Sequence, residues 1–129
     1  MGEINIKLYN PEDGWSCTLD ALQLSDIEFE LRSNHLWEES LTYGTIIQVV
    51  EKQEPDNSYV LKAIRKESDF YTSRFLLNSN TDQSKLRMIG DEIMELGGYW
   101  EVVFGGYAIV NIPKDSNFKL DERIKSIMG

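Results

Sequence analysis

The chain has 129 residues and a net charge of −9, so it is long enough for one compact core but short for two full domains. No apolar run approaches the ~20 residues that cross a bilayer. The chain has 22 acidic and 13 basic residues, which argues against nucleic-acid binding, because such binding depends on Lys and Arg. Because Cys17 is the only cysteine and Met1–Lys7 lacks a signal core, we expect no disulfide, no membrane partner and a cytoplasmic location.

The first part of the chain predicts antiparallel strands. Apolar and polar residues alternate in three runs, with the period of a strand that buries one face. These runs are 3–8, 16–21 and 27–32. The turn-forming residues 10–14 end the first run, and the other two runs are typical of a hairpin with one solvated face.

Two further strands are expected before residue 67. Thr45–Val50 is a continuous run rich in β-branched residues, which is typical of a strand deep in a sheet. Glu54–Asn57 is rich in turn formers, so Tyr59–Lys66 is expected to return antiparallel to the preceding strand.

Residues 34–40, between the hairpin and the next strand, are ambiguous. One interpretation is a single helical turn capped by Asn34, since Asn is a favoured N-cap residue. Leu36 and Trp37 would then face inward.

The second half of the chain has the clearest pattern, in the order strand, helix, strand, strand, helix. The segments are 69–77, 82–96, 99–104, 107–112 and a final helix that begins near Ser116 or Asn117. This order is the split β-α-β arrangement of ferredoxin-like folds.

The helix over 82–96 carries an apolar stripe on one face. Thr81 or Asn80 is expected to cap its start, and Gly97-Gly98 to end it. Gly90 costs about 1 kcal/mol in a helix interior relative to Ala, which indicates a close approach of this helix to the sheet.

Together these patterns predict an α+β fold with mostly antiparallel strands. A β-rich N-terminal half, residues 1–66, is expected to pack with a ferredoxin-like β-α-β-β-α C-terminal half, residues 67–129. No segment has the composition of a linker, so residues 1–129 are expected to form a single domain.

Several of these features occur together in a known family. They are a Tyr-Gly step into an apolar strand (Leu41–Ile47), a helix that ends in Gly-Gly, a Gly-punctuated hairpin and a Val-Asn-Ile-Pro exit (Val110–Pro113). In these features residues 36–128 resemble a bacterial family of small domains of unknown function. Thr45 stands where that family usually carries Asp. The family has no assigned activity, so the resemblance implies no catalytic or binding residue.

Residues that carry nucleophilic catalysis are scarce. His35 is the only histidine, and Cys17 lies in an alternating strand where a buried, inert thiol is expected. A Cys17–His35 nucleophile pair is therefore not favoured, because such catalysis requires several positioned groups. A surface histidine beside Trp37 is the preferred interpretation.

Metal and cofactor signatures are also missing from the sequence. One Cys and one His cannot make a zinc site alone, and Asp91 and Glu95 occupy the solvated face of their helix. Neither Gly97-Gly98 nor Gly105-Gly106 opens a helix, as a phosphate-binding loop requires. We therefore expect no catalytic residue, no metal ligand and no cofactor.

Aromatic residues around the Gly105-Gly106 hairpin, namely Tyr99, Trp100 and Tyr107, are the candidate interaction surface, although covering the core is the commoner role of such side chains. The negative charge permits a basic protein partner, and a homodimer that pairs through a sheet edge is equally allowed. The first hypothesis is a non-enzymatic protein–protein interaction module, of which a toxin-neutralising, immunity-type inhibitor is one concrete form. The alternative is a small-molecule-binding regulatory domain of ferredoxin-like type.

Overall fold

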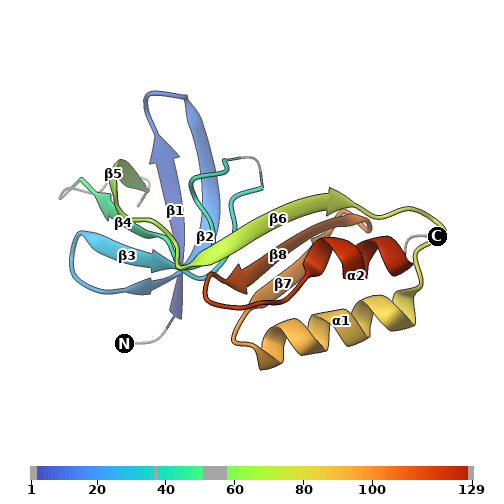
Figure 1. Ribbon diagram of the computed structural model, residues 1–129. Helices are drawn as coiled ribbons and strands as arrows, with labels where there is room; N and C mark the ends of the chain where they lie inside the picture. The colour runs from blue at the N-terminus through green and yellow to red at the C-terminus, as the bar shows by residue number, and fades with distance from the viewer. Residues whose placement is uncertain (1–2, 37, 51–57, 128–129) are drawn as a thin grey trace. The chain divides into compact units, whose positions relative to one another are not determined.

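The chain folds into two compact units, Met1–Asp69 (the barrel unit) and Phe70–Gly129 (the α/β unit). The computed structural model in Figure 1 describes residues 3–36, 38–50 and 58–127. Within these ranges the chain forms eight strands and two helices, and every strand pair except β1–β5 is antiparallel. This confirms the α+β class and the mostly antiparallel pairing. The packing of the two halves into a single domain stays a prediction.

Five strands of the barrel unit form a closed barrel. They are β1 (Glu3–Asn10), β2 (Trp15–Gln23), β3 (Glu28–Leu31), β4 (Ile46–Val49) and β5 (Tyr59–Lys66). Each strand pairs antiparallel with the next, which confirms the predicted β2–β3 hairpin and the return of β5 along β4. A short parallel contact between β1 and β5 closes the barrel, with Leu8 opposite Tyr59 and Tyr9 opposite Val60. Closure was not predicted, because it depends on tilt and register between strands distant in sequence.

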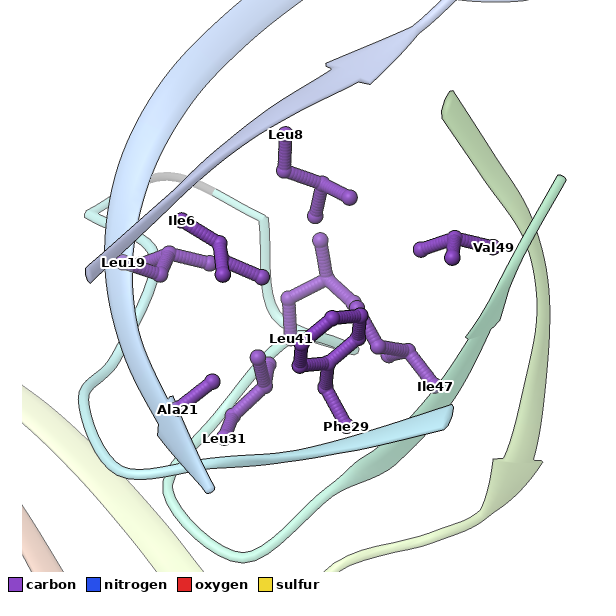
Figure 2. Close-up of a cluster of buried hydrophobic side chains, with 9 residues drawn as sticks. All are labelled: Ile6, Leu8, Leu19, Ala21, Phe29, Leu31, Leu41, Ile47 and Val49. Carbon is purple, nitrogen blue, oxygen red and sulfur yellow. The ribbon is translucent and has the colours of Figure 1, made fainter. Parts of the chain in front are cut away.

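The barrel interior is filled mainly by side chains from alternate strand positions (Figure 2). The buried cluster consists of Ile6, Leu8, Leu19, Ala21, Phe29, Leu31, Leu41, Ile47 and Val49. Phe29 is fully buried, and its ring packs edge-on against Tyr59 with the ring centroids 4.9 Å apart. Burying a side chain of this size contributes about 2–3 kcal/mol, so the period-two pattern decides which face of each strand lies inside.

Residues 34–40 do not form the predicted helical turn, since the described part of this segment contains no helix. Asn34 Oδ1 instead accepts a hydrogen bond from the Tyr43 N–H (2.9 Å). Asn side chains compete with helices by making such bonds to nearby backbone. Trp37 and the predicted turn at 54–57 lie outside the described residues.

The α/β unit has three strands and two helices in its described residues. They are β6 (Phe70–Leu76), α1 (Gln83–Glu95), β7 (Tyr99–Val103), β8 (Tyr107–Pro113) and α2 (Leu120–Ile127). β8 lies between β6 and β7 and is antiparallel to both, so β6 and β7 run in the same direction and α1 connects them. A complete ferredoxin-like fold adds a fourth strand after its second helix, and that finer assignment stays a prediction.

The first turn of α1 is capped one residue later than predicted. Asp82 Oδ1 accepts a hydrogen bond from the Lys85 N–H (3.1 Å). Thr81 and Asn80 were the predicted caps, but Thr81 Oγ1 is already the acceptor for the Asn78 N–H (3.1 Å). The hydroxyl is therefore used to close the preceding turn, and the carboxylate caps the helix.

The end of α1 is formed by the predicted glycine pair. Gly97 has a φ of 86°, and its N–H donates to the Met94 carbonyl (3.1 Å). The Gly98 N–H donates to the Ile93 carbonyl (2.9 Å). These two bonds are those of a Schellman motif, which requires a left-handed residue where only glycine is unstrained.

The second helix starts later than the sequence predicts. α2 begins at Leu120, whereas the prediction was near Ser116 or Asn117. Ser116 Oγ accepts a hydrogen bond from the Phe118 N–H (3.1 Å), which holds these residues in a turn before the helix.

Both helices cover the same face of the three-stranded sheet (Figure 1). The core between them contains Leu86, Ile89, Ile93, Val110, Ile112, Leu120, Ile124 and Ile127. Gly90 lies where α1 meets β7, and a Cβ atom on Gly90 would overlap the indole ring of Trp100. The predicted close approach of helix and sheet is therefore confirmed.

We expect Gly90→Ala to lower the free energy of unfolding by about 1–3 kcal/mol, the usual cost of overpacking. This loss is expected even though alanine favours a helix over glycine by about 1 kcal/mol, because the Cβ atom needs the space that Trp100 fills. Urea unfolding monitored by Trp fluorescence measures the change. Asp91→Ala, at the exposed neighbouring position, is the control and should be nearly neutral. An equally or more stable Gly90→Ala variant would contradict this account of the packing.

Candidate functional site

The negative charge of the protein is concentrated in the barrel unit. Residues 1–69 contain 14 acidic and 6 basic residues, a net charge of −8, whereas residues 70–129 contain 8 and 7, a net charge of −1. The total charge alone did not reveal this division, because it appears only once the boundary between the units is known. The barrel unit is therefore the main source of the negative electrostatic field of the protein.

Three of the cations in the barrel unit are already paired. Arg32 lies 3.0 Å from Glu30, Arg65 lies 3.4 Å from Glu28, and Lys66 lies 3.4 Å from Asp69. Other exposed carboxylates have no ion pair within residues 3–36, 38–50 and 58–69. They are Glu3, Glu12, Asp13, Asp20, Asp26, Glu39 and Glu67. Among the described residues of the unit, these charges are therefore solvent-exposed and not neutralised by ion pairs.

A cavity of about 660 Å³ lies on this acidic unit. One wall is the first part of β2, residues 15–20, and the other is the segment 33–36 that follows β3. Asn5 of β1 also lines it, and its Nδ2 donates a hydrogen bond to Asp20 Oδ1 (2.9 Å). The volume is in the range of small-ligand and peptide-side-chain pockets.

The wall formed by β2 is an open strand edge. β2 pairs with β1 over residues 15–22, but β3 pairs with it only over 21–23. The last bonds of the ladder join the Arg32 N–H to the Asp20 carbonyl (2.8 Å) and the Asp20 N–H to Ser33 Oγ (3.0 Å). After these bonds the chain turns away from β2.

Two residues of β2 then present their backbone to the cavity. Backbone groups of a strand alternate between its two neighbours, so Ser16 and Thr18 point their N–H and C=O groups to the same side as Asp20. In the part of the chain that the structure describes, no hydrogen bond reaches these groups from that side. The edge therefore resembles the vacant side of a sheet.

Asn34 on the opposite wall has a second unsatisfied group. The residue is only 4% exposed, and its Oδ1 accepts a hydrogen bond from the Tyr43 N–H. Its Nδ2 is buried and has no hydrogen-bond partner. A buried donor without an acceptor costs about 1–3 kcal/mol, so an acceptor group supplied by a ligand would recover part of that cost.

His35 is buried, so the expectation of a surface histidine is wrong. Its ring packs against that of Trp15 of β2, with the centroids 4.6 Å apart and the ring planes inclined at 58°, and its Nδ1 accepts a hydrogen bond from the Glu38 N–H (2.8 Å). The sequence could not show this contact, because Trp15 is twenty residues away along the chain and adjacent only through the barrel. Both residues line the cavity.

Cys17 and His35 line the same cavity, but the thiol is not activated. Burial raises the pKa of Cys17 from 9.0 to about 11. A thiol with this pKa is protonated at neutral pH and is a poor nucleophile. The cavity is therefore better suited to binding than to thiol chemistry.

The predicted interaction residues do not share one face of the sheet. Trp100 faces the helices and packs at Gly90, whereas Tyr99 and Tyr107 lie on the opposite face. Tyr99 donates a hydrogen bond from its hydroxyl to Glu101 Oε2 (3.1 Å). The role of these three residues as an interaction surface stays a prediction.

Residues 3–36, 38–50 and 58–127 contain no group of three or more His, Cys, Asp or Glu arranged to hold a metal ion. Neither α1 nor α2, the helices of the described chain, has the length and apolar character needed to span a bilayer.

Comparison with known proteins gives a likeness of fold. No protein-family model and no curated protein matches the chain. A solved structure, described as the novel crystal structure of a hypothetical protein from Neisseria gonorrhoeae, is similar with a TM-score of 0.62 and 17% sequence identity. The match covers 97% of this chain and 82% of that chain. At this identity the match shows that the two proteins share a fold, and it assigns no activity.

The raised pKa of Cys17 predicts slow alkylation of the native protein. At pH 8 a pKa of about 11 leaves about a hundredfold less thiolate than a pKa of 9.0, so iodoacetamide should react about a hundredfold more slowly than with the urea-unfolded chain. Because the folded pKa is raised, the associated stability is present below about pH 9 and is lost as the pH rises through 11. Mass spectrometry of timed samples measures the rates. Equal rates in the folded and unfolded chains would contradict the burial of the thiol.

Proposed function

We propose that the protein is a non-enzymatic protein–protein interaction module that binds a basic protein partner through its barrel unit. The observation that carries this proposal is the distribution of charge, −8 on the barrel unit and −1 on the α/β unit. Like-signed charge gathered on one unit accelerates encounter with an oppositely charged surface and orients it.

The chemistry of the cavity supports binding over catalysis. Its one thiol is protonated at neutral pH, and its histidine Nδ1 is occupied as an acceptor by the Glu38 N–H. An inhibitor that neutralises a basic toxin, as immunity-type proteins do, is one concrete form of such a module. The resemblance of residues 36–128 to a bacterial family of unknown function belongs to the same proposal, since that family has no assigned activity.

A small-molecule-binding regulatory domain is the second candidate. The cavity of about 660 Å³ and the unpartnered Nδ2 of Asn34 favour it, because together they offer space and a hydrogen-bond donor. The cavity is in the barrel unit, however, and not at the strand–helix turn where a ferredoxin-like regulatory domain would bind its ligand. A homodimer through the barrel unit is disfavoured, since it brings two units of charge −8 together.

The test uses a twelve-residue peptide of alternating Lys and Val, with a Glu–Val peptide of the same length as the control. Titration of the whole protein should perturb amide NMR signals of the barrel unit, and binding should weaken about tenfold or more between about 50 and 300 mM salt. Binding that maps to residues 70–127, or that is insensitive to salt, would contradict the proposal.

Matched charge variants make the test specific. Glu12→Gln with Asp13→Asn removes two exposed charges from the barrel unit, and Asp91→Asn with Glu95→Gln removes two from the α/β unit. We expect the first pair to weaken binding of the Lys–Val peptide by about two- to fivefold at low salt and the second to leave it unchanged. Equal effects of the two pairs would show that only the net charge matters.

A further inference from the structure

We propose that the open edge of β2, residues 16–20, is a docking site for an extended basic segment of the partner protein, which adds to the barrel as a further strand. The proposal rests on the proposed function and specifies how the partner binds. It is independent of the Tyr99, Trp100 and Tyr107 surface.

The backbone of β2 provides the first argument. Ser16 and Thr18 direct N–H and C=O groups to the side where the ladder with β3 has ended, and these groups have no partner among the described residues. An added strand would continue the ladder beyond the Asp20–Arg32 bond. Strand addition obtains its affinity from such main-chain bonds. The five residues of the edge correspond to about 16 Å of extended chain.

The shape of the cavity provides the second argument. The segment 33–36 forms its far wall, so a guest strand would lie in a groove and not on a flat edge. Asn34 lies on that wall with its Nδ2 unpartnered. A peptide carbonyl is the acceptor that this amide lacks. The Nδ2 atom is itself buried, so the main-chain bonds on which the proposal rests are those to β2.

The side chains along the groove define the chemistry of the guest. Its side chains alternate between the outer and inner faces of the barrel, as those of β2 do. On the outer side Asp20 is an exposed carboxylate, which favours a Lys or Arg beside it. On the inner side Trp15, Cys17 and Leu36 favour apolar residues. The expected guest therefore alternates basic and apolar residues.

A second copy of this chain is the less favourable occupant. Pairing two β2 edges would place Asp20 of one molecule near acidic residues of another, in units that each carry a charge of −8. Like charges on facing strands are destabilising. A basic partner has the opposite balance, so charge complementarity decides between the two occupants.

Amide hydrogen exchange on the whole protein, with and without the Lys–Val peptide, tests the proposal directly. We expect the Thr18 N–H to exchange at least about tenfold more slowly in the complex, because a new hydrogen bond protects it. The Cys17 N–H faces β1, where Cys17 lies opposite Leu8, and serves as the internal control that should change little.

Alternate N-methylation of the peptide provides an independent test. Methyl groups on every second amide remove the donors on only one side of an extended strand. Methylation of one set of alternate amides should therefore weaken binding about tenfold or more, and methylation of the other set should leave binding intact. Thr18→Pro, which removes a donor on the open edge but none on the β1 side, should weaken binding similarly, with circular dichroism verifying the fold.

The outcomes separate this inference from the proposed function. Strand addition would be overturned if the peptide bound the barrel unit in a salt-dependent way but left exchange at Thr18 unchanged, and if both sets of alternate N-methylation gave equal affinities. The charge-based proposal would then still stand. No binding of the peptide would overturn both. Protection of Thr18 without peptide, together with a dimeric mass by light scattering, would show that a second copy occupies the edge and would also overturn the inference.

Discussion

The structure of the candidate site depends on where one hydrogen-bonded ladder ends. The Arg32 N–H and the Asp20 carbonyl form the last backbone bond between the β3 side and β2. One residue later Ser33 Oγ takes the place of a carbonyl and accepts the Asp20 N–H. A side-chain acceptor at that point satisfies the Asp20 donor while freeing the backbone to turn away from β2. The cavity and the vacant edge both follow from this substitution.

The two units differ in net charge. In the α/β unit Arg123 forms a bidentate ion pair with Glu92, in which two guanidinium N–H groups donate to the two carboxylate oxygens at 2.7 and 2.8 Å. These hydrogen bonds lower the pKa of Glu92. This pair joins α1 to α2, and acidic and basic residues are nearly balanced in the unit as a whole. In the barrel unit the inward positions hold the apolar core, and the outward positions carry an unbalanced set of carboxylates. Self-repulsion of this kind costs stability, which is consistent with a role in binding.

The sequence predicted what depends on local periodicity and failed where distant segments meet. Alternation and helical spacing identified the strands and helices, and Gly97-Gly98 marked a helix end through backbone conformation alone. Closure of the barrel and burial of His35 against Trp15 depend on register and on contacts between separate segments. The open edge was missed for the same reason, because residues 16–20 look like any half-buried strand. Only the position of the segment 33–36 shows that one side of β2 is vacant.

An open strand edge is normally a hazard, because it pairs with any exposed edge, including that of an identical molecule. Proteins protect such edges with charge, and here the charge has one sign. Asp20 lies at the end of the vacant edge, and the surrounding unit carries a net charge of −8. In the proposed complex, the same carboxylates that discourage self-pairing would attract a cationic strand. Specificity is a difference between two affinities, and one set of charges changes both affinities in the required directions. Solubility alone does not require an acidic surface around an unpaired edge. This difference between affinities gives a physical reason for one.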